Sequence, residues 1–244
     1  MKSLLKLIFL LILSGLTSSA LGQVSFQETR VTVQNGEWEL VGDLTLPNSG
    51  KNPPVVLMLN KAAGDRTVYA GLARQLALSG IASLRLDLRG HGESINVEKF
   101  VPYKSEGPDP LIWDAEADVN AAIDYLKNHS SFSSSKIAVV GASYSGEEMA
   151  EAGRMEGYVD AYVALSPGSF SDESIAGIDA SDVPWLFIVS RNEPHLKEIT
   201  AEVQKESESV ELIIVPGKEH ATRLLPDRPE LNEWIAIWLL KVLK

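Results

Sequence analysis

Residues 137–146 read Ile-Ala-Val-Val-Gly-Ala-Ser-Tyr-Ser-Gly, and they are the most informative part of the chain about its fold. Its first four residues are apolar and predict a short buried strand. Gly141 to Gly146 are mostly small residues, which allow the chain to turn sharply in a strained conformation. The residues from Gly146 to Met155 predict a helix. Ser143 therefore lies in a tight turn between a strand and a helix, a placement that suits a catalytic nucleophile.

The same alternation of strand and helix extends on both sides of this turn. It favours a mostly parallel sheet that is covered by helices on both faces. The expected strands are 55–59, 81–88, 136–140, 158–165, 185–189 and 210–215, and the expected helices are 67–78, 111–127, 146–155, 195–205 and 229–243. Residues 168–183 are expected to be rich in loops. The residues that follow the strands meet at one edge of such a sheet, so the site is expected there.

An antiparallel hairpin is expected before this alternation. The segments 26–34 and 37–46 both alternate between apolar and polar residues, and Asn35-Gly36 joins them. Asn-Gly between two such segments is a strong hairpin signal. We therefore predict an α/β fold, with a mostly parallel doubly wound sheet and an N-terminal hairpin, in a single domain from residue 23 to 244.

The turn around Ser143 resembles the G-x-S-x-G nucleophile elbow of the α/β-hydrolase superfamily. Gly141 and Ser143 match this motif, whereas Ser145 stands where glycine is usual, and Gly146 follows it. From residue 55 to 244 the chain is most similar to small members without a large cap, such as dienelactone-hydrolase-like and prolyl-oligopeptidase-like domains. The resemblance implies the α/β-hydrolase fold and a nucleophilic Ser143.

The same resemblance identifies a base and an acid. His220 lies in the sequence Pro-Gly-Lys-Glu-His-Ala, directly after the last expected strand and before the last helix, where the family has its catalytic histidine. A carboxylate must orient this base. Glu193 follows the strand 185–189, at the place where the family usually has aspartate. The order along the chain, Ser143, Glu193 and His220, is the order that the family requires.

The sequence also contains alternatives to this acid and this base. Asp172 and Asp179 lie in the connection after the strand 158–165, so either is a rival of Glu193. His91 belongs to a loop that shapes a turn in many α/β-hydrolases, and we expect a structural role for it. His129 is expected to be solvated, and His195 to begin a helix.

The stabilisation of an oxyanion needs two backbone donors. The Tyr144 N–H can supply the first, because it follows the nucleophile directly and the positive N-terminus of the expected helix points at the site. The second donor normally follows the first central strand, and we assign it to Ala62, with Lys61 as the next choice. Asn60-Lys61 replaces the His-Gly that related hydrolases often have here. Asn60 and Lys61 are possible substrate contacts: Lys61 could reach an anionic group of the substrate, although the interpretation that it simply points to water is favoured.

The pocket is expected to be small or open, because neither residues 96–110 nor 168–183 is long enough to form a large cap. Trp113 and Phe170 are candidates for its wall. Aromatic residues beside helices are also common in cores, so both alternatives stay open.

The first 22 residues have the pattern of a secretory signal peptide. Lys2 and Lys6 precede an apolar run that is short for a membrane span, and small residues follow it. Cleavage after Ala20 or after Gly22 satisfies the small-residue rule. We therefore expect a secreted or periplasmic protein that is not stably inserted in the membrane after cleavage.

Composition excludes several other functions. The formal charge of −11 opposes binding to nucleic acid or to anionic lipid. The chain has no cysteine, which excludes a thiolate nucleophile. The four histidines are scattered, so no metal site is predicted. No cofactor is predicted either, because the glycine-rich turn lacks the lysine of a phosphate-binding loop.

Together these features predict a serine esterase that acts through an acyl-enzyme on a small-molecule ester. A non-catalytic binding protein with the same fold is the first alternative, because Ser145 and the Asn60-Lys61 corner depart from the family. An acyl transferase or a peptidase with the same triad is the second. The sequence does not specify the acyl group, the alcohol or the oligomeric state.

Overall fold

The computed structural model describes residues 26–48, 51–105, 107–132, 135–153, 158–168, 170–193, 197, 200 and 208–244. The expected signal peptide lies outside the described residues, and so do His195 and most of the helix predicted over 195–205. No helix among the described residues combines the length and the hydropathy that a membrane span requires.

The N-terminal hairpin forms where the sequence predicts it. Strands β1 (Phe26–Asn35) and β2 (Trp38–Pro47) are antiparallel, and Asn35 is the partner of Trp38 at the turn. Gly36 has φ of 58°, a conformation that glycine adopts without a steric cost. The Asn-Gly signal is thereby confirmed.

One eight-stranded sheet organises the described residues, with strand order β1-β2-β4-β3-β7-β8-β9-β10. Its parallel part contains β3 (Val55–Leu59), β4 (Ala82–Leu86), β7 (Ile137–Ala142), β8 (Ala161–Leu165), β9 (Trp185–Ser190) and β10 (Val210–Val215). Each of β3, β4, β7, β8 and β9 is buried along its whole length. The predicted fold class, a mostly parallel sheet with an antiparallel pair at its N-terminal edge, is confirmed.

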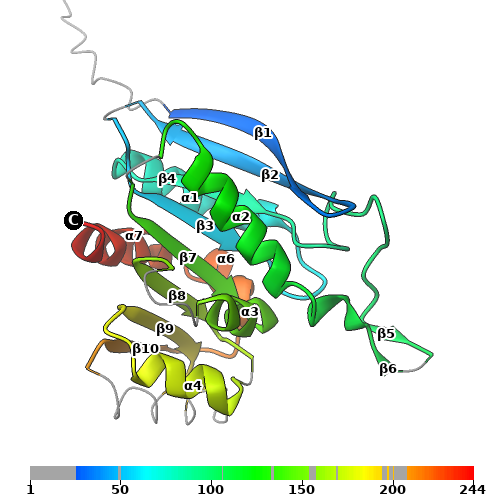
Figure 1. The fold of residues 1–244 in the computed structure, drawn as a ribbon. Coiled ribbons are helices and arrows are strands. Elements are labelled where there is room, and N and C mark those ends of the chain that lie inside the picture. The colour runs from blue at the N-terminus through cyan, green and yellow to red at the C-terminus, as the bar shows by residue number, and fades with distance from the viewer. Residues whose placement is uncertain are drawn as a thin grey trace, which may run out of the picture.

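Helices cover both faces of the sheet. One face carries α2 (Glu116–Asn128), α3 (Tyr144–Ala152) and α4 (Asp172–Asp179), which lie in front of the sheet in Figure 1. The other face carries α1 (Ala70–Leu78), α6 (Leu224–Asp227) and α7 (Glu230–Val242). Each face therefore has its own apolar core, as a doubly wound sheet requires.

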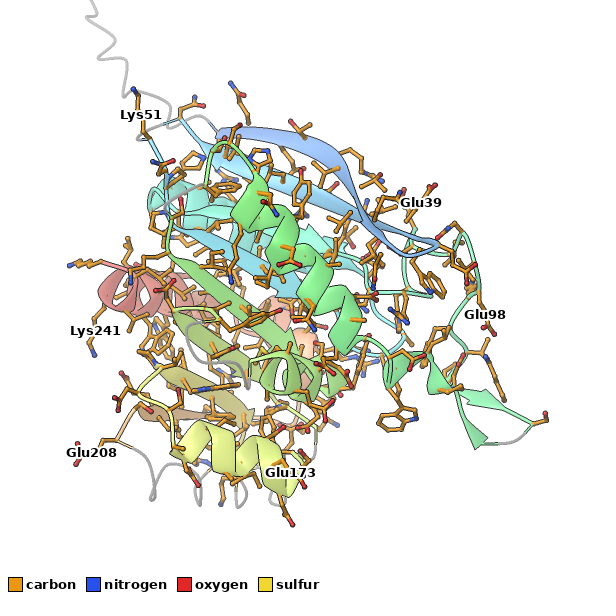
Figure 2. The ribbon with its side chains drawn as sticks, in the orientation of Figure 1. Glu39, Lys51, Glu98, Glu173, Glu208 and Lys241 are labelled. Carbon is orange, nitrogen blue, oxygen red and sulfur yellow. The ribbon has the colours of Figure 1, made fainter. Side chains whose placement is uncertain are left out.

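Short elements complete the edge at which the parallel strands end. They are the 3-10 turns η1 (Arg66–Tyr69), η2 (Pro110–Ile112) and η3 (Ala221–Arg223) and the two-residue strands β5 (Tyr103–Lys104) and β6 (Gly107–Pro108). Figure 2 shows Glu98 and Glu173 pointing away from the body of the protein.

Several predicted elements have different bounds in the structure; the strand predicted from 158, for example, begins only at Ala161. The helix predicted over 111–127 begins only at Glu116, because Pro110–Ile112 forms a 3-10 turn that the Asp109 side chain caps. The helix after Ser143 begins at Tyr144, two residues earlier than predicted. Residues 168–183 contain α4, where Ser171 caps the first turn by accepting from the Ser174 N–H, so the prediction of a loop-rich segment was wrong.

Candidate active site

Ser143 occupies a strained turn at the carboxyl end of β7. Its φ is 56° and its ψ is −126°, a conformation that non-glycine residues rarely adopt. Glycines leave room for this turn: a Cβ on Gly141 would lie 2.6 Å from the Ser145 carbonyl oxygen, and one on Gly146 would lie 2.8 Å from Pro167 Cβ. The small residues of the motif therefore have a direct steric reason.

Ser145, the residue that departs from the family motif, is completely buried. Its Oγ accepts a hydrogen bond from the Ala142 N–H at 2.8 Å. The hydroxyl lies 3.0 Å from the Ala142 carbonyl oxygen and 3.3 Å from that of Leu59. Serine is accommodated here because its hydroxyl finds backbone partners on the strands that flank the turn.

The structure brings Ser143, His220 and Glu193 together. His220 follows β10, and its Nε2 lies 3.1 Å from Ser143 Oγ. Glu193 follows β9, and its Oε1 lies 2.7 Å from His220 Nδ1. The two rivals of Glu193, Asp172 and Asp179, lie instead at the two ends of α4. The carboxylate that touches the imidazole is thus the one that sequence reasoning ranked first.

Two serines that the sequence did not single out hold Glu193. Ser166, directly after β8, donates its hydroxyl to Glu193 Oε2 at 2.8 Å. Ser190, the last residue of β9, donates its backbone N–H to the same oxygen at 3.0 Å. The Ser190 hydroxyl also donates to the carbonyl oxygen of Glu219, the residue before His220, at 2.6 Å. The only sequence signal for these residues is their place at the ends of adjacent strands.

The expected oxyanion donors lie at the ends of β3 and β7. Tyr144 is the first residue of α3, and the first N–H groups of a helix have no partner inside that helix. Lys61 and Ala62 follow β3 in a turn in which the Gly64 N–H donates to the Lys61 carbonyl. Ala63 has φ of 54°, so this turn bends the backbone sharply.

Asn60 has a role different from the predicted substrate contact. It is completely buried; its Oδ1 accepts from the Leu88 N–H at 2.8 Å, and its Nδ2 donates to the Lys61 carbonyl at 3.0 Å. Asn60 therefore fixes the turn after β3, and its side chain is not exposed for a substrate to contact. Lys61 is partly exposed and donates to the Ala62 carbonyl at 3.0 Å. Burial, followed by the charge of Arg223, lowers the Lys61 pKa.

A buried ion pair also holds the turn after β3 in place. Arg66 binds Asp87 through its guanidinium and through its backbone N–H, the latter at 2.7 Å. The Arg66 guanidinium also contacts Asp43 at 3.0 Å and Glu93 at 2.8 Å. Both Arg66 and Asp87 are buried, and burial raises the Asp87 pKa. The loops after β3 and β4 are thereby tied to each other.

The remaining aromatic and histidine candidates differ in how far they are buried. His91 is buried and stacks between Phe100, at 4.5 Å, and Tyr144, at 5.9 Å, which agrees with a structural role. Phe170 is buried in the core, whereas Trp113 is 62% exposed. Of these two pocket candidates, only Trp113 is open to a ligand. The described residues contain no cluster of side chains suited to a metal ion.

A strand-end serine, histidine and glutamate on a doubly wound sheet make this protein an α/β-hydrolase. More specifically, the chain belongs to the X-Pro dipeptidyl-peptidase family (S15 family), whose pattern matches residues 36–172. The matched region contains Ser143 but ends before Glu193 and His220.

Solved structures are similar over most of the chain. Dienelactone hydrolase from Anabaena variabilis has a TM-score of 0.73 at 22% identity, covering 90% of this chain and 99% of that one. Est1E from Butyrivibrio proteoclasticus, solved with ferulic acid, has a TM-score of 0.69 at 18% identity, covering 87% and 98%. An esterase from Pyrococcus furiosus has a TM-score of 0.68 at 15% identity, covering 90% and 92%. At these identities the likeness establishes the fold.

Curated relatives are more similar in sequence but longer. An uncharacterized protein of Mycobacterium tuberculosis, found in two strains, is 31% identical over 157 residues. The match covers 64% of this chain and 50% of the relative. The chain thus spans about half the length of the curated relatives it matches.

Proposed function

We propose that the protein is a serine hydrolase that cleaves carboxylic esters, with Ser143 as nucleophile, His220 as base and Glu193 as the orienting acid. The observation that carries this proposal is the hydrogen-bonded chain from Ser143 Oγ through both His220 nitrogens to Glu193 Oε1, at 3.1 Å and 2.7 Å. A serine hydroxyl is a weak nucleophile until an adjacent, correctly oriented base removes its proton.

Catalysis would proceed in two halves. Ser143 Oγ attacks the ester carbonyl carbon while His220 Nε2 takes its proton. The tetrahedral intermediate collapses, and the departing alkoxide takes that proton to leave as the alcohol. Water then attacks the acyl-enzyme and gives a proton to the same nitrogen. When the second intermediate collapses, the acid leaves and Ser143 Oγ recovers its proton.

Backbone donors would stabilise both intermediates. The Tyr144 N–H lies at the positive end of α3, where negative charge is favoured. The second donor would come from Ala62, or from Lys61 as the next choice, in the turn that Asn60 and the Arg66–Asp87 pair fix. Donors that are fixed before the reaction need no reorganisation as charge develops on the carbonyl oxygen.

An ester is favoured over a peptide because the described residues contain no domain-sized insertion at the edge of the sheet that holds the site. Two of the similar solved structures, from Butyrivibrio and Pyrococcus, carry esterase names. Cleavage of X-Pro peptides is the second candidate, and the specific observation that favours it is the family match over residues 36–172.

Hydrolysis of p-nitrophenyl butyrate and of alanyl-prolyl-p-nitroanilide, measured in parallel, tests both candidates. We expect turnover of the ester, and a loss of about 10³-fold or more in kcat for Ser143→Ala. Ser83→Ala is the matched control, because the Ser83 hydroxyl is buried on β4 without a hydrogen-bond partner among the described residues. Turnover of the anilide alone would favour the peptidase. Ester turnover undiminished in Ser143→Ala would reject Ser143 as the nucleophile.

The non-catalytic alternative is tested by a fluorophosphonate probe, which labels an activated serine. A folded protein in which Ser143 never reacts would support a binding role and contradict the proposed hydrolase. The two family departures that motivate this alternative, Ser145 and the Asn60-Lys61 corner, are both compatible with an ordered site, because their side chains bond to backbone groups.

Lys61 is proposed to contact an anionic part of the substrate. Its side chain is only partly buried, and Arg223 lies near enough to lower its pKa, so positive charge gathers between the turn after β3 and η3. For Lys61→Met we expect a raised KM for a monoester of succinate and an unchanged KM for the neutral butyrate. Equal KM changes for both esters would show that Lys61 points to water.

We propose further that the protein is exported, that its partner is a small ester and that it binds no nucleic acid. The signal-like residues 1–22 and the charge of −11 support this. Secretion from a bacterial host, followed by N-terminal sequencing, is expected to give a chain that begins at Leu21 or Gln23. A chain that keeps Met1 after export would contradict cleavage.

A further inference from the structure

The segment Leu165–Gly168, at the end of β8, contacts the turn of the nucleophile directly. The Ser143 N–H donates to the Leu165 carbonyl at 3.2 Å, and the Gly168 N–H donates to the Ser143 carbonyl at 2.9 Å. Pro167 packs against Gly146 so closely that a Cβ there would lie 2.8 Å from Pro167 Cβ. We call this segment the β8 bridge; it fixes the backbone of Ser143 on both sides.

The same segment also reaches the acid. Ser166 lies in the middle of the β8 bridge, and its hydroxyl donates to Glu193 Oε2 at 2.8 Å. Its N–H donates to the Ile188 carbonyl on β9 at 2.8 Å. Because β8 lies between β7 and β9 in the sheet (Figure 1), this bridge joins the strand that carries Ser143 to the strand that precedes Glu193.

The backbone of Ser166 has a strained conformation. Its φ is 39°, in the left-handed region that glycine enters freely and a serine enters only at a steric cost. The residue is completely buried. Strained, buried residues persist where the surroundings hold them, and they cluster at functional sites. Here the strained backbone carries a hydroxyl that points at the carboxylate of the candidate acid.

Both oxygens of Glu193 are therefore assigned. Oε2 receives the Ser166 hydroxyl and the Ser190 N–H, which leaves Oε1 to face His220 Nδ1 at 2.7 Å. A glutamate has one more rotatable bond than an aspartate, so its carboxylate needs more restraint to keep one orientation. The Ser190 N–H alone leaves the carboxylate free to rotate about that contact.

We propose that Ser166 is a positioning residue, which uses one hydroxyl to hold the Glu193 carboxylate toward His220 from a segment that also fixes Ser143. This inference rests on the proposed hydrolase function. In this proposal the β8 bridge holds the nucleophile and the acid at a fixed position relative to each other. The residue acts through Glu193 and does not touch the substrate.

Ser166→Gly is the decisive variant, because glycine relieves the backbone strain while it removes the hydroxyl. We expect kcat for p-nitrophenyl butyrate to fall about tenfold with KM unchanged, since one hydrogen bond to a charged group is lost. The melting temperature is expected to stay within a few degrees of the wild type. Ser166→Ala should show the same loss of kcat, which guards against a misfolded variant.

The matched control is Thr45→Ala, which removes a buried hydroxyl that donates to Glu28 at 3.2 Å in the N-terminal hairpin. It should leave kcat unchanged. Wild-type kcat in Ser166→Gly would overturn the proposal. A rise in KM together with a large fall in melting temperature in both variants would also overturn it, because that pattern indicates a purely structural role.

Proton NMR separates this inference from the function on which it rests. The proton between His220 Nδ1 and Glu193 should give a low-field resonance that Glu193→Gln removes and that Ser166→Gly weakens or broadens. An unchanged resonance in Ser166→Gly would contradict the positioning role. Absence of Ser143-dependent ester turnover in the wild type would instead contradict the proposed function, and the resonance would still test the role of Ser166.

Discussion

At the scale of single residues, Glu193 differs from the aspartate that many α/β-hydrolases have at this place. Its longer side chain reaches back from the end of β9 so that one oxygen faces His220 and the other meets Ser166 and Ser190. Three donors converge on this one carboxylate. The acid of the proposed triad is therefore oriented by its own contacts before any substrate binds.

Two substitutions of Glu193 should distinguish the effect of its charge on kcat from the effect of its side-chain length. In Glu193→Gln the carboxylate can no longer stabilise the imidazolium, and we expect kcat to fall by about 10³-fold or more. Glu193→Asp keeps the charge but shortens the side chain, so a smaller fall is expected. Glu208→Gln, an exposed glutamate labelled in Figure 2, is the control. Steady-state ester kinetics measure all three, and full activity in Glu193→Gln would exclude Glu193 as the acid.

Glu148 makes a second residue-scale prediction, which concerns stability. It lies on α3 with 2% of its surface exposed and accepts from the Glu116 N–H at 2.9 Å. Burial, followed by the charge of Glu151, raises its pKa to about 8. The unfolded chain ionises this group near the ordinary value of 4.5, so between pH 4.5 and 8 the folded state holds the extra proton. The contribution of Glu148 to stability therefore declines as pH rises through this window.

Removing the ionisable group should remove that decline. Glu148→Gln is expected to melt at a higher temperature than the wild type at pH 9 and to differ little from it at pH 5. Thermal unfolding followed by circular dichroism measures the difference at each pH. Glu173→Gln, an exposed glutamate on α4, serves as the control. An equal shift at both pH values would refute the assigned cause.

At the scale of elements, the turn between β7 and α3 tolerates a serine where the nucleophile elbow of α/β-hydrolases usually has glycine. The Ser145 hydroxyl satisfies the buried Ala142 N–H, which glycine cannot do. For Ser145→Gly we expect a loss of about 2 kcal/mol in the free energy of unfolding, or a melting temperature about 4–8 °C lower. Ester turnover at a temperature where the variant is folded should stay within severalfold. A loss of activity without a loss of stability would show that the hydroxyl serves catalysis instead.

Two strands have the bounds that the sequence predicts. β3 and β10 are mostly apolar runs that end sharply at polar residues or proline, although only β3 is buried along its whole length. The predicted start of the helix at residue 111 was wrong. Helical periodicity alone does not show that Asp109 caps a separate 3-10 turn before the helix. Helix α4 was not predicted because Gly177 and several polar residues interrupt the apolar face of the helix. The Ser171 cap is the one sequence feature that indicates its start.

At the scale of the whole molecule, the sheet brings residues that are far apart in the sequence together at one edge. Ser143, Glu193 and His220 were predictable because the parallel strands that precede them end at the same edge. Ser166 was not, because its role depends on a φ of 39° and on the side-by-side placement of β8 and β9. The burial of Asn60 was equally unpredictable, since its two backbone partners come from different loops.

The proposed catalytic mechanism depends on Ser143 being an activated nucleophile. The most direct test is to treat the folded protein with a fluorophosphonate and to locate the adduct by peptide mass spectrometry. We expect one adduct, on Ser143, formed rapidly in the wild type and at least about a hundredfold more slowly in His220→Ala. An adduct on another residue, or equal labelling rates in the wild type and His220→Ala, would contradict it.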